Sequence, residues 1–301
     1  MELKAISILR TLALFFAGQT PGTGRIPGDI RLLPNYGRPV DVIVVAHEDD
    51  WQLFMGDILT TRLRLGNRGV FVYLTAGDDG RDSTYWQTRE RAALQSTRIA
   101  AGLSIGQPLS CSVVEIHQHP IKRCVDRDIE SYFLRLPDGK RNGKGFSRYG
   151  HQSLRKLRAK PRSEISAIDA STTYRGLTDL MTTVGEIAQL DSTAVTVHTS
   201  DPSIRRNPHD HFDHRITGLL VQDLRKQHRV AAMYYLGYAL ATRAPNRSTG
   251  QVQAKTTLLL AYDREMMAVN QTWSAYREHR AFYSQCMERT YAVRSPVPDV
   301  H

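Results

Sequence analysis

The sequence of 301 residues predicts an α/β fold, with a Rossmann-like, mainly parallel sheet and helices on both faces. Short β-branched runs alternate with longer segments whose apolar residues recur at helical spacing, which is typical of parallel strands joined by crossover helices. The composition, 41% hydrophobic and 23% charged, is that of a globular protein with a sizeable core. No internal repeat or interdomain linker is visible, so we expect a single domain.

The predicted elements begin at residue 41. DVIVVA is a β-branched run, and WQLFMGDILTTRLRLG spaces its apolar residues as a helix does and ends at a glycine, a common helix C-cap. GVFVYLTA and SCSVVEIH have the same strand character as the first run. We predict strands at 41–46, 69–76, 110–117, 193–199 and 230–238, and helices at 51–66, 85–103, about 174–189, about 212–227 and 255–271.

Two regions fall outside this alternation. Residues 1–39 form an N-terminal extension that fits a weak signal peptide or a surface helix, because Arg10 interrupts its apolar stretch. Residues at about 118–162 are rich in Gly, Lys and Arg, and we expect a long irregular insertion that serves as a lid or a wall of the binding site. The domain itself would span residues 40–301. No apolar run is long enough to span a bilayer, and we expect a cytoplasmic location, with a secreted or periplasmic one as the alternative.

The chain is basic, with a net charge of +10 and a pI of about 9.6. The basic residues are mostly scattered, which favours a solvated surface, although the excess also suits an anionic partner. No basic stretch carries interleaved aromatic residues, so we expect no nucleic-acid partner. Cys111, Cys124 and Cys286 form no CxxC pair, which argues against a cysteine zinc site but leaves one disulfide open.

Two polar clusters follow predicted strands at their carboxyl ends, where ligands bind in doubly wound sheets. His47 to Asp50 come directly after the first strand, and the segment HDHFDH occupies residues 209–214. Histidine and carboxylate groups are what zinc binds when cysteine is absent, and a catalytic zinc commonly has three protein ligands. His47, Asp50 and His214 would supply such a set. The alternative is that the aspartates only cap the helices that follow them.

The same residues carry a resemblance to a known family. AHEDD at 46–50, followed by HDHFDH, resembles the PIG-L/LmbE family of zinc-dependent N-acetylglucosamine deacetylases, whose usual motifs are AHPDDE and HxDH. The segments VYLTAGDDGRDSTYWQTRERAA, FLRLPDGKRNGKG and TVHTSDP extend the similarity over about residues 40–270, and AHEDD is similar to a bacterial branch. The resemblance implies a zinc-dependent hydrolase that removes an N-acetyl or other N-acyl group from an amino sugar in a glycoconjugate.

The resemblance also implies a role for each motif position. His47, Asp50 and His214 fall where the zinc ligands of the family stand, and Asp49 falls where its general base stands. His211 falls where a second histidine stabilises the oxyanion or protonates the leaving amine. A carboxylate next to a ligand in sequence cannot easily bind the same ion, so Asp49 would be free to accept a proton.

Two positions depart from the family pattern. Glu48 replaces the usual proline, and Trp51 replaces the usual glutamate. Neither position is a ligand in the family, so we expect metal binding to survive. The missing carboxylate at position 51 leaves the support of the ligands, or the orientation of the substrate, in doubt.

The sequence is less specific about the substrate. Arg81 and Arg89 follow the second strand, near the expected mouth of the site, and we expect them to bind a sugar hydroxyl or a phosphate. The basic charge suggests an anionic part on the amino-sugar glycoconjugate. His209 is the main rival to His211 and His214 within its motif.

Three further histidines, His117, His119 and His151, are expected at the surface. Two other function classes stay open. One is a metal-dependent phosphoesterase, which is disfavoured because two-metal sites usually need more carboxylates than the motifs offer. The other is a non-catalytic carbohydrate-binding protein on the same fold, which the intact Asp49 disfavours.

Overall fold

The computed structural model describes residues 37–104, 109–159, 164–190 and 194–295. The described residues belong to one compact unit. Almost all of the predicted N-terminal extension, and with it the choice between a signal peptide and a surface helix, lies outside them. Within the described ranges, no helix combines the length and the apolar character that crossing a membrane requires.

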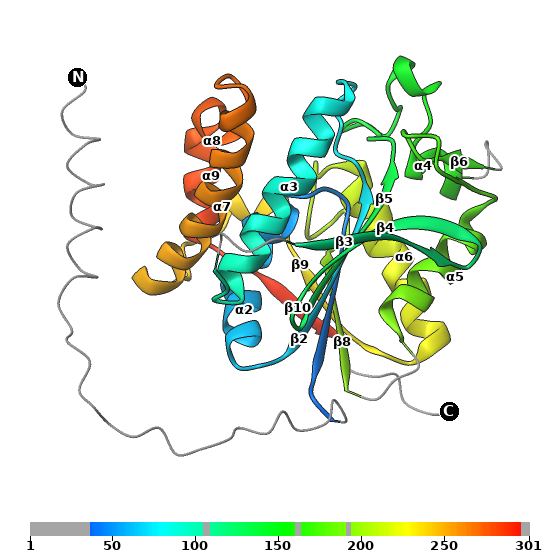
Figure 1. The fold of residues 1–301 in the computed structure, drawn as a ribbon. Helices are drawn as coiled ribbons and strands as arrows, with labels where there is room; N and C mark the ends of the chain where they lie inside the picture. Colours follow the sequence, from blue (N-terminus) through cyan, green and yellow to red (C-terminus); the bar gives the residue numbers. More distant parts are fainter. Residues whose placement is uncertain (1–36, 105–108, 160–163, 191–193, 296–301) are drawn as a thin grey trace. The chain divides into compact units, whose positions relative to one another are not determined.

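A central sheet of eight strands organises the described part of the chain (Figure 1). Its strands are β1 (Val40–Val45), β2 (Arg68–Thr75), β3 (Ser110–Ile116), β4 (His119–Asp126), β5 (Ile129–Leu136), β8 (Val195–Ser200), β9 (Ala231–Tyr235) and β10 (Ala292–Ser295). The order across the sheet is β10-β9-β8-β1-β2-β5-β4-β3. The five strands from β9 to β5 are parallel, and the outer strands are antiparallel. The predicted mainly parallel sheet is therefore confirmed.

Helices cover both faces of this sheet, as predicted (Figure 1). They are α2 (Asp50–Arg64), α3 (Ser83–Ala100), α4 (Leu154–Arg158), α5 (Leu177–Ala188), α6 (Phe212–His228), α7 (Thr249–Val269), α8 (Ala275–Glu278) and α9 (Arg280–Met287). The remaining elements are two 3₁₀ turns, η1 (Ser147–Tyr149) and η2 (Tyr238–Thr242), and a small ribbon of β6 (Ile165–Ser166) and β7 (Thr173–Tyr174). Helix α7 begins earlier than predicted, because Ser248 at its N-cap and Gln251 in its first turn form a capping box.

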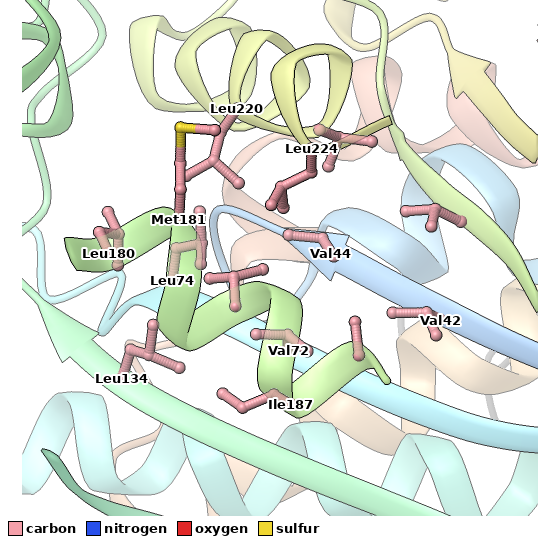
Figure 2. Close-up of a cluster of buried hydrophobic side chains, with 14 of the residues drawn as sticks. Val42, Val44, Val72, Leu74, Leu134, Leu180, Met181, Ile187, Leu220 and Leu224 are labelled. Atoms are coloured by element: carbon pink, nitrogen blue, oxygen red, sulfur yellow. The ribbon is translucent and has the colours of Figure 1, made fainter. Parts of the chain in front are cut away.

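Strand β1 shows why the sheet needs helices on both faces. Successive strand side chains point to opposite faces, so the unbroken apolar run after Asp41 supplies two cores. Val42 and Val44 pack under α5 and α6, in the cluster that Figure 2 shows. Ile43 and Val45 face α2, α3 and α7 instead. A fully apolar strand of this kind is buried on both sides, which fits its central place in the sheet.

The predicted irregular insertion at about 118–162 is only partly irregular. Residues 119–126 and 129–136 form β4 and β5, and β5 pairs parallel with β2 inside the sheet. The prediction was wrong here because Lys122, Arg123 and Arg135 interrupt the apolar pattern. These cations lie at the carboxylates of Glu90 and Glu130, so charged residues occur within true strands. Irregular backbone begins only after β5.

The structure also answers the open question of the cysteines. Cys111 of β3 and Cys124 of β4 stand opposite each other in the antiparallel pair and form a disulfide. Cys286 is buried and free.

The strand order places a binding edge between β1 and β8. The chain builds outward from β1 through β2 and β5 on one side and continues through β8 and β9 on the other. Such a reversal opens a crevice at the carboxyl ends of the two neighbouring strands. The loops that follow β1 and β8 are the ones that carry the two polar motifs.

Candidate metal centre

Three predicted ligands meet at the carboxyl end of β1. His47 follows β1, Asp50 is the first residue of α2, and His214 lies in the first turn of α6. The separations are 3.1 Å from His47 Nδ1 to His214 Nε2, 2.9 Å from His214 Nε2 to Asp50 Oδ1, and 3.4 Å from His47 Nδ1 to Asp50 Oδ1. Ligand atoms about 2.0–2.1 Å from a tetrahedral zinc are about 3.3 Å apart. The triangle therefore has the size that a zinc ion requires.

Hydrogen bonds behind the ligands fix their orientation. The backbone N–H of His47 donates to Asp50 Oδ2 at 2.8 Å, which leaves Oδ1 directed at the triangle. His214 Nδ1 lies 3.0 Å from Asp210 Oδ1, so Nε2 is the nitrogen that faces the ligands. Asp210 is itself held by Asn207 Nδ2 at 2.6 Å. Partners of this kind set the tautomer and direction of metal-binding histidines.

The electrostatics of the cluster favour a cation. Burial disfavours a charged His214, but Asp50 and Asp210 outweigh burial and raise the pKa of His214 to about 10. His47 behaves in the same way, because Asp50 and Asp213 raise its pKa well above its usual range despite burial. The surplus of carboxylate charge that favours a proton here favours a metal ion equally well.

His47 retains an unused nitrogen in this arrangement. Its Nε2 is buried and has no hydrogen-bond partner within the described residues. The nearest carboxylates are Asp213 at 3.6 Å and Asp138 at 3.7 Å. Asp213 is in turn held by the backbone N–H of Gly139 at 2.7 Å. Two carboxylates thus stand behind the ring, on the side away from the ligand triangle, as the partners behind metal-binding histidines commonly do.

Asp49 does not act as a helix cap. It occupies the N-cap position of α2, yet its side chain makes no capping hydrogen bond. Its Oδ1 accepts a 2.6 Å hydrogen bond from Arg89 Nη2 instead, and Arg89 Nε donates to Glu48 Oε2 at 2.9 Å. Burial raises the pKa of Glu48 to about 7 in spite of the neighbouring guanidinium. The capping alternative is therefore wrong for Asp49.

His211 lies beside the triangle, and one of its ring nitrogens lies within 4.8 Å of ring nitrogens of His47 and His214. It is the N-cap of α6, and its Nδ1 accepts the backbone N–H of Asp213 at 3.2 Å. Burial and the nearby His47 lower the pKa of His211 to about 4. The ring is therefore neutral near pH 7, and because Nδ1 is an acceptor, Nε2 carries the proton. That N–H can donate a hydrogen bond into the site.

These groups surround a cavity of about 500 Å³. His47, Asp49 and Asp50 lie at one part of its wall, and His211 lies beside them. Arg81 and Arg89, the two predicted substrate residues, also line it. The other charged and aromatic lining residues are Asp79, Tyr85, Asp138, Lys140, Arg141, Phe146, Tyr238, Glu278, His279 and Tyr283. Both polar motifs and both arginines are thus brought to one cavity.

Comparison with known proteins places the chain in a family. The sequence model of PIG-L, described as GlcNAc-PI de-N-acetylase, matches residues 42–224. The chain belongs to the PIG-L family. A search of curated proteins gives no match.

Solved structures show similarity at low sequence identity. N,N'-diacetylchitobiose deacetylase from Pyrococcus horikoshii is 16% identical, with a TM-score of 0.43, over 98% of this chain and 93% of its own. A triple mutant of a deacetylase involved in teicoplanin biosynthesis is 12% identical, with a TM-score of 0.47, over 85% of this chain and 98% of its own. GalB, a 4-carboxy-2-hydroxymuconate hydratase from Pseudomonas putida KT2440, is 12% identical, with a TM-score of 0.40, over 82% of each chain. These likenesses concern the fold.

Within the PIG-L family pattern, the two departures in this chain have structural explanations. Trp51 is fully buried and packs against Phe71, with ring centroids 5.1 Å apart, so it is a core residue. Glu48 is also fully buried and binds Arg89. The carboxylate missing at position 51 is thus accompanied by one at position 48, whose partner Arg89 lines the cavity.

Four other histidines considered in the sequence analysis lie away from the triangle. His209 is exposed and lies outside the ligand triangle. His117 and His151 are exposed, as predicted. His119 contradicts the prediction of a surface position, because it is buried, stacks on Tyr174 and lies 2.9 Å from Asp179.

Three residues near the site escaped the sequence analysis: Asp138, Lys140 and Arg141. They follow the carboxyl end of β5, which was not recognised as a strand. The signal was present in the sequence, because PDG after the run IESYFLRL is typical of a turn after a strand. Asp213 was considered from the sequence only as a possible cap of the next helix, but His211 is the N-cap of α6.

Proposed function

We propose that the protein is a zinc-dependent hydrolase that removes an N-acetyl or other N-acyl group from an amino sugar in a glycoconjugate. The observation that carries the proposal is the ligand triangle of His47, Asp50 and His214, next to a cavity where Asp49 and His211 are both available. Membership of the PIG-L family supports the choice of an N-acetylated amino sugar as the substrate class.

His47, Asp50 and His214 would hold the zinc ion. When bound, zinc supplies a Lewis acid that polarises an amide carbonyl and makes water more acidic. The protein contributes the fixed directions of the ligand atoms, because each ligand is hydrogen-bonded from behind. A site that is already oriented loses little free energy to reorganisation during the reaction.

Asp49 would accept the proton of the attacking water. Its side chain lines the cavity and is free of the helix-capping role. The guanidinium of Arg89 holds Oδ1 and leaves Oδ2 for the proton. Arg89 would therefore act mainly by orienting Asp49. Arg81, which is partly exposed and lies 4.4 Å over the Tyr85 ring, would be the arginine that contacts substrate.

His211 would stabilise the oxyanion of the tetrahedral intermediate. Its neutral ring presents the Nε2 proton to the cavity, and a fixed donor at such a position is worth roughly 2.7–4 kcal/mol in other hydrolases. Because its pKa is lowered to about 4 by burial, we assign it the hydrogen-bonding role. The proton for the leaving amine would then come from Asp49.

One observation keeps the phosphoesterase alternative in view. His47, Asp138, His211 and Asp213 also offer ligand atoms that lie within 4.8 Å of one another. Asp138 and Asp213 supply the additional carboxylates whose absence disfavoured a two-metal site on sequence grounds. However, such a second ion would compete with the ligand triangle for His47.

The proposal is tested with zinc-loaded protein on two panels, N-acetylglucosaminides assayed for acetate and phosphate esters assayed for phosphate. We expect acetate release only. Asp49→Asn should keep the bound zinc and lose at least ~100-fold in turnover, since a general base contributes that much or more. Asn caps a helix as well as Asp does, so a fully active variant would refute the base role. Phosphate release, or no turnover on any glycoside with zinc bound, would refute the deacetylase assignment.

A further inference from the structure

We propose that Lys140 and Arg141 form an anion-binding subsite in the wall of the cavity, which takes a phosphate or carboxylate attached to the amino sugar. The inference rests on the proposed function for the identity of the sugar. Its structural basis is separate, because it depends on residues outside both metal motifs.

The charges that line the cavity are mostly paired. Arg89 is bound to Glu48 and Asp49, and Arg81 lies 3.3 Å from Asp79. Lys140 and Arg141 differ from them, because neither side-chain cation has a carboxylate oxygen within 4.0 Å of its nitrogens among the residues that the structure describes. Two adjacent cations without an anionic partner, in the wall of a cavity, leave room for an anion from the ligand.

The lining carboxylates are engaged elsewhere. Asp50 belongs to the ligand triangle, and Asp138 faces His47 and His211, at 3.7 Å from each. Glu278 is the exception, since its nearest cationic partner is His279 at 3.9 Å. Glu278 is an exposed residue of the short helix α8, whereas the two cations lie on the loop after β5.

Aromatic rings hold both cations in place. Lys140 Nζ lies 4.4 Å from the centroid of the Phe146 ring, and Arg141 Cζ lies 5.5 Å from that of Tyr238. Phe146 and Tyr238 also line the cavity. A cation over a ring keeps its N–H donors available for an anion, because the ring occupies only one face of it.

The loop that carries the cations is fixed at its backbone. The N–H of Lys140 donates to Asp138 Oδ1 at 2.6 Å, and the carbonyl of Lys140 accepts the N–H of Gly143 at 2.9 Å. The carbonyl of Arg141 accepts the N–H of Phe212, the first residue of α6, at 3.2 Å. The side chain of Arg141 donates to the carbonyl of His209 at 2.9 Å. These contacts join the loop to the second metal motif.

The start of the loop is also tightly packed. A side chain at Gly139 would bring its Cβ within 2.5 Å of Asp213 Oδ1, so the backbone approaches the partner of His47 closely. Lys140 itself has φ of 61°, a left-handed conformation that is uncommon outside glycine and persists where the surroundings enforce it. The cations are therefore presented by a built structure that is continuous with the active site.

The chemistry of the pair suits an oxyanion. Arginine offers a planar fork of donors and lysine a compact ammonium, and together they match the several oxygens of a phosphate or a carboxylate. We expect such a group on the substituent that the amino sugar carries, because the reacting amide belongs at the ligand triangle. A substrate with this group would be selected over a neutral glycoside.

The test compares three α-glycosides of N-acetylglucosamine: the 1-phosphate, the carboxymethyl glycoside and the neutral methyl glycoside. We expect kcat/KM to favour an anionic glycoside over the methyl glycoside by roughly 10-fold or more, the effect of one charge-assisted hydrogen bond. The two anionic arms show whether phosphate or carboxylate is preferred. Lys140→Gln, and the double variant Lys140→Gln/Arg141→Gln, should remove the preference and leave the methyl glycoside nearly unaffected.

Lys144→Gln is the matched control, because Lys144 is an exposed cation of the same loop that does not line the cavity. If Lys144→Gln weakens the preference as much as Lys140→Gln does, net charge is responsible and the subsite is refuted. A preference that survives in the double variant refutes it as well. Calorimetric binding of the three sugars separates the two proposals, since selective binding of an anionic sugar without acetate release would support the subsite and refute the deacetylase.

Discussion

The two ends of β1 both carry buried histidine and aspartate, yet they differ in how completely these groups are satisfied. At the start of the strand, Asp41 accepts hydrogen bonds from Arg62 Nε at 2.7 Å and Asn67 Nδ2 at 2.7 Å, and His198 Nε2 lies 2.9 Å from it. The other ring nitrogen of His198 lies 2.8 Å from the hydroxyl of Tyr235. Every side-chain polar atom of Asp41 and His198 is therefore paired.

At the end of the strand, some buried polar atoms lack a suitable hydrogen-bond partner. Two ring nitrogens, His47 Nδ1 and His214 Nε2, point at each other across 3.1 Å, and both approach the same oxygen of Asp50. His47 Nε2 and Asp213 Oδ1 have no partner within the described residues. Buried polar groups normally have hydrogen-bond partners. Clusters of polar groups without partners often indicate a missing ion or a catalytic role. The contrast supports our proposal that the second network binds a metal ion, whereas the first is structural.

The largest effect is expected from a substitution that breaks the second network, at the end of β1. His214→Ala removes a proposed direct ligand, and zinc affinity should fall by at least ~1000-fold, more than the ~10–100-fold typical for partners behind a ligand. His209→Ala is the matched control, since His209 is exposed and belongs to the same motif. Zinc content by mass spectrometry, and the rise in Tm on adding zinc, measure the difference. If His209→Ala loses zinc and His214→Ala retains it, the assignment of the ligands is wrong.

A smaller effect is expected at the first network, and it should be one of stability. Asp41→Asn keeps one acceptor oxygen but removes the carboxylate that Arg62, Asn67 and His198 share, which should lower the free energy of unfolding by about 1–3 kcal/mol. Zinc affinity of the folded protein should not change. Asp128→Asn is the control, because Asp128 is half-exposed and its pair with Arg38 should contribute no more than ~1 kcal/mol. Equal losses in urea unfolding, or loss of zinc in Asp41→Asn, would contradict the comparison.

The sequence predicted that the residues of the candidate metal end would meet, but it did not predict the structural end, and the reason is physical. His47, Asp50 and His214 follow predicted strands, and the carboxyl ends of neighbouring parallel strands meet at one edge, so their meeting could be expected. Asp41 and His198 are single polar residues within strands. Only the register that sets Ile43 of β1 beside His198 of β8 brings them together, and no local pattern encodes that register.

The same reasoning explains what was missed beside the site. Lys122, Arg123 and Arg135 concealed β4 and β5, because charged residues within a strand interrupt its apolar pattern. Lys122 and Arg135 pair with Glu90, which is distant in sequence. With β5 unrecognised, Asp138 and the cations after it could not be assigned to the binding edge. Elements with clear periodicity were predictable, whereas charged strands that depend on long-range partners were not.

The smallest expected effect is a pH dependence at the structural end. Burial lowers the pKa of His198 below its usual value and outweighs the attraction of Asp41. The folded protein then binds fewer protons at His198 than the unfolded chain does, so its stability falls as the pH drops below about 6.5, by at most ~1.4 kcal/mol per pH unit. The pKa of Asp41 is lowered, since its partners outweigh its burial, so this carboxyl stays ionised in the same window.

Urea unfolding between pH 5 and 8, with a chelator present so that the metal site is empty in every sample, should show that the stability advantage of wild type over His198→Gln shrinks as the pH falls. An advantage that stays constant over this range would show that His198 titrates alike in the folded and unfolded protein, and the contrast between the two ends of β1 would then rest on hydrogen bonds alone.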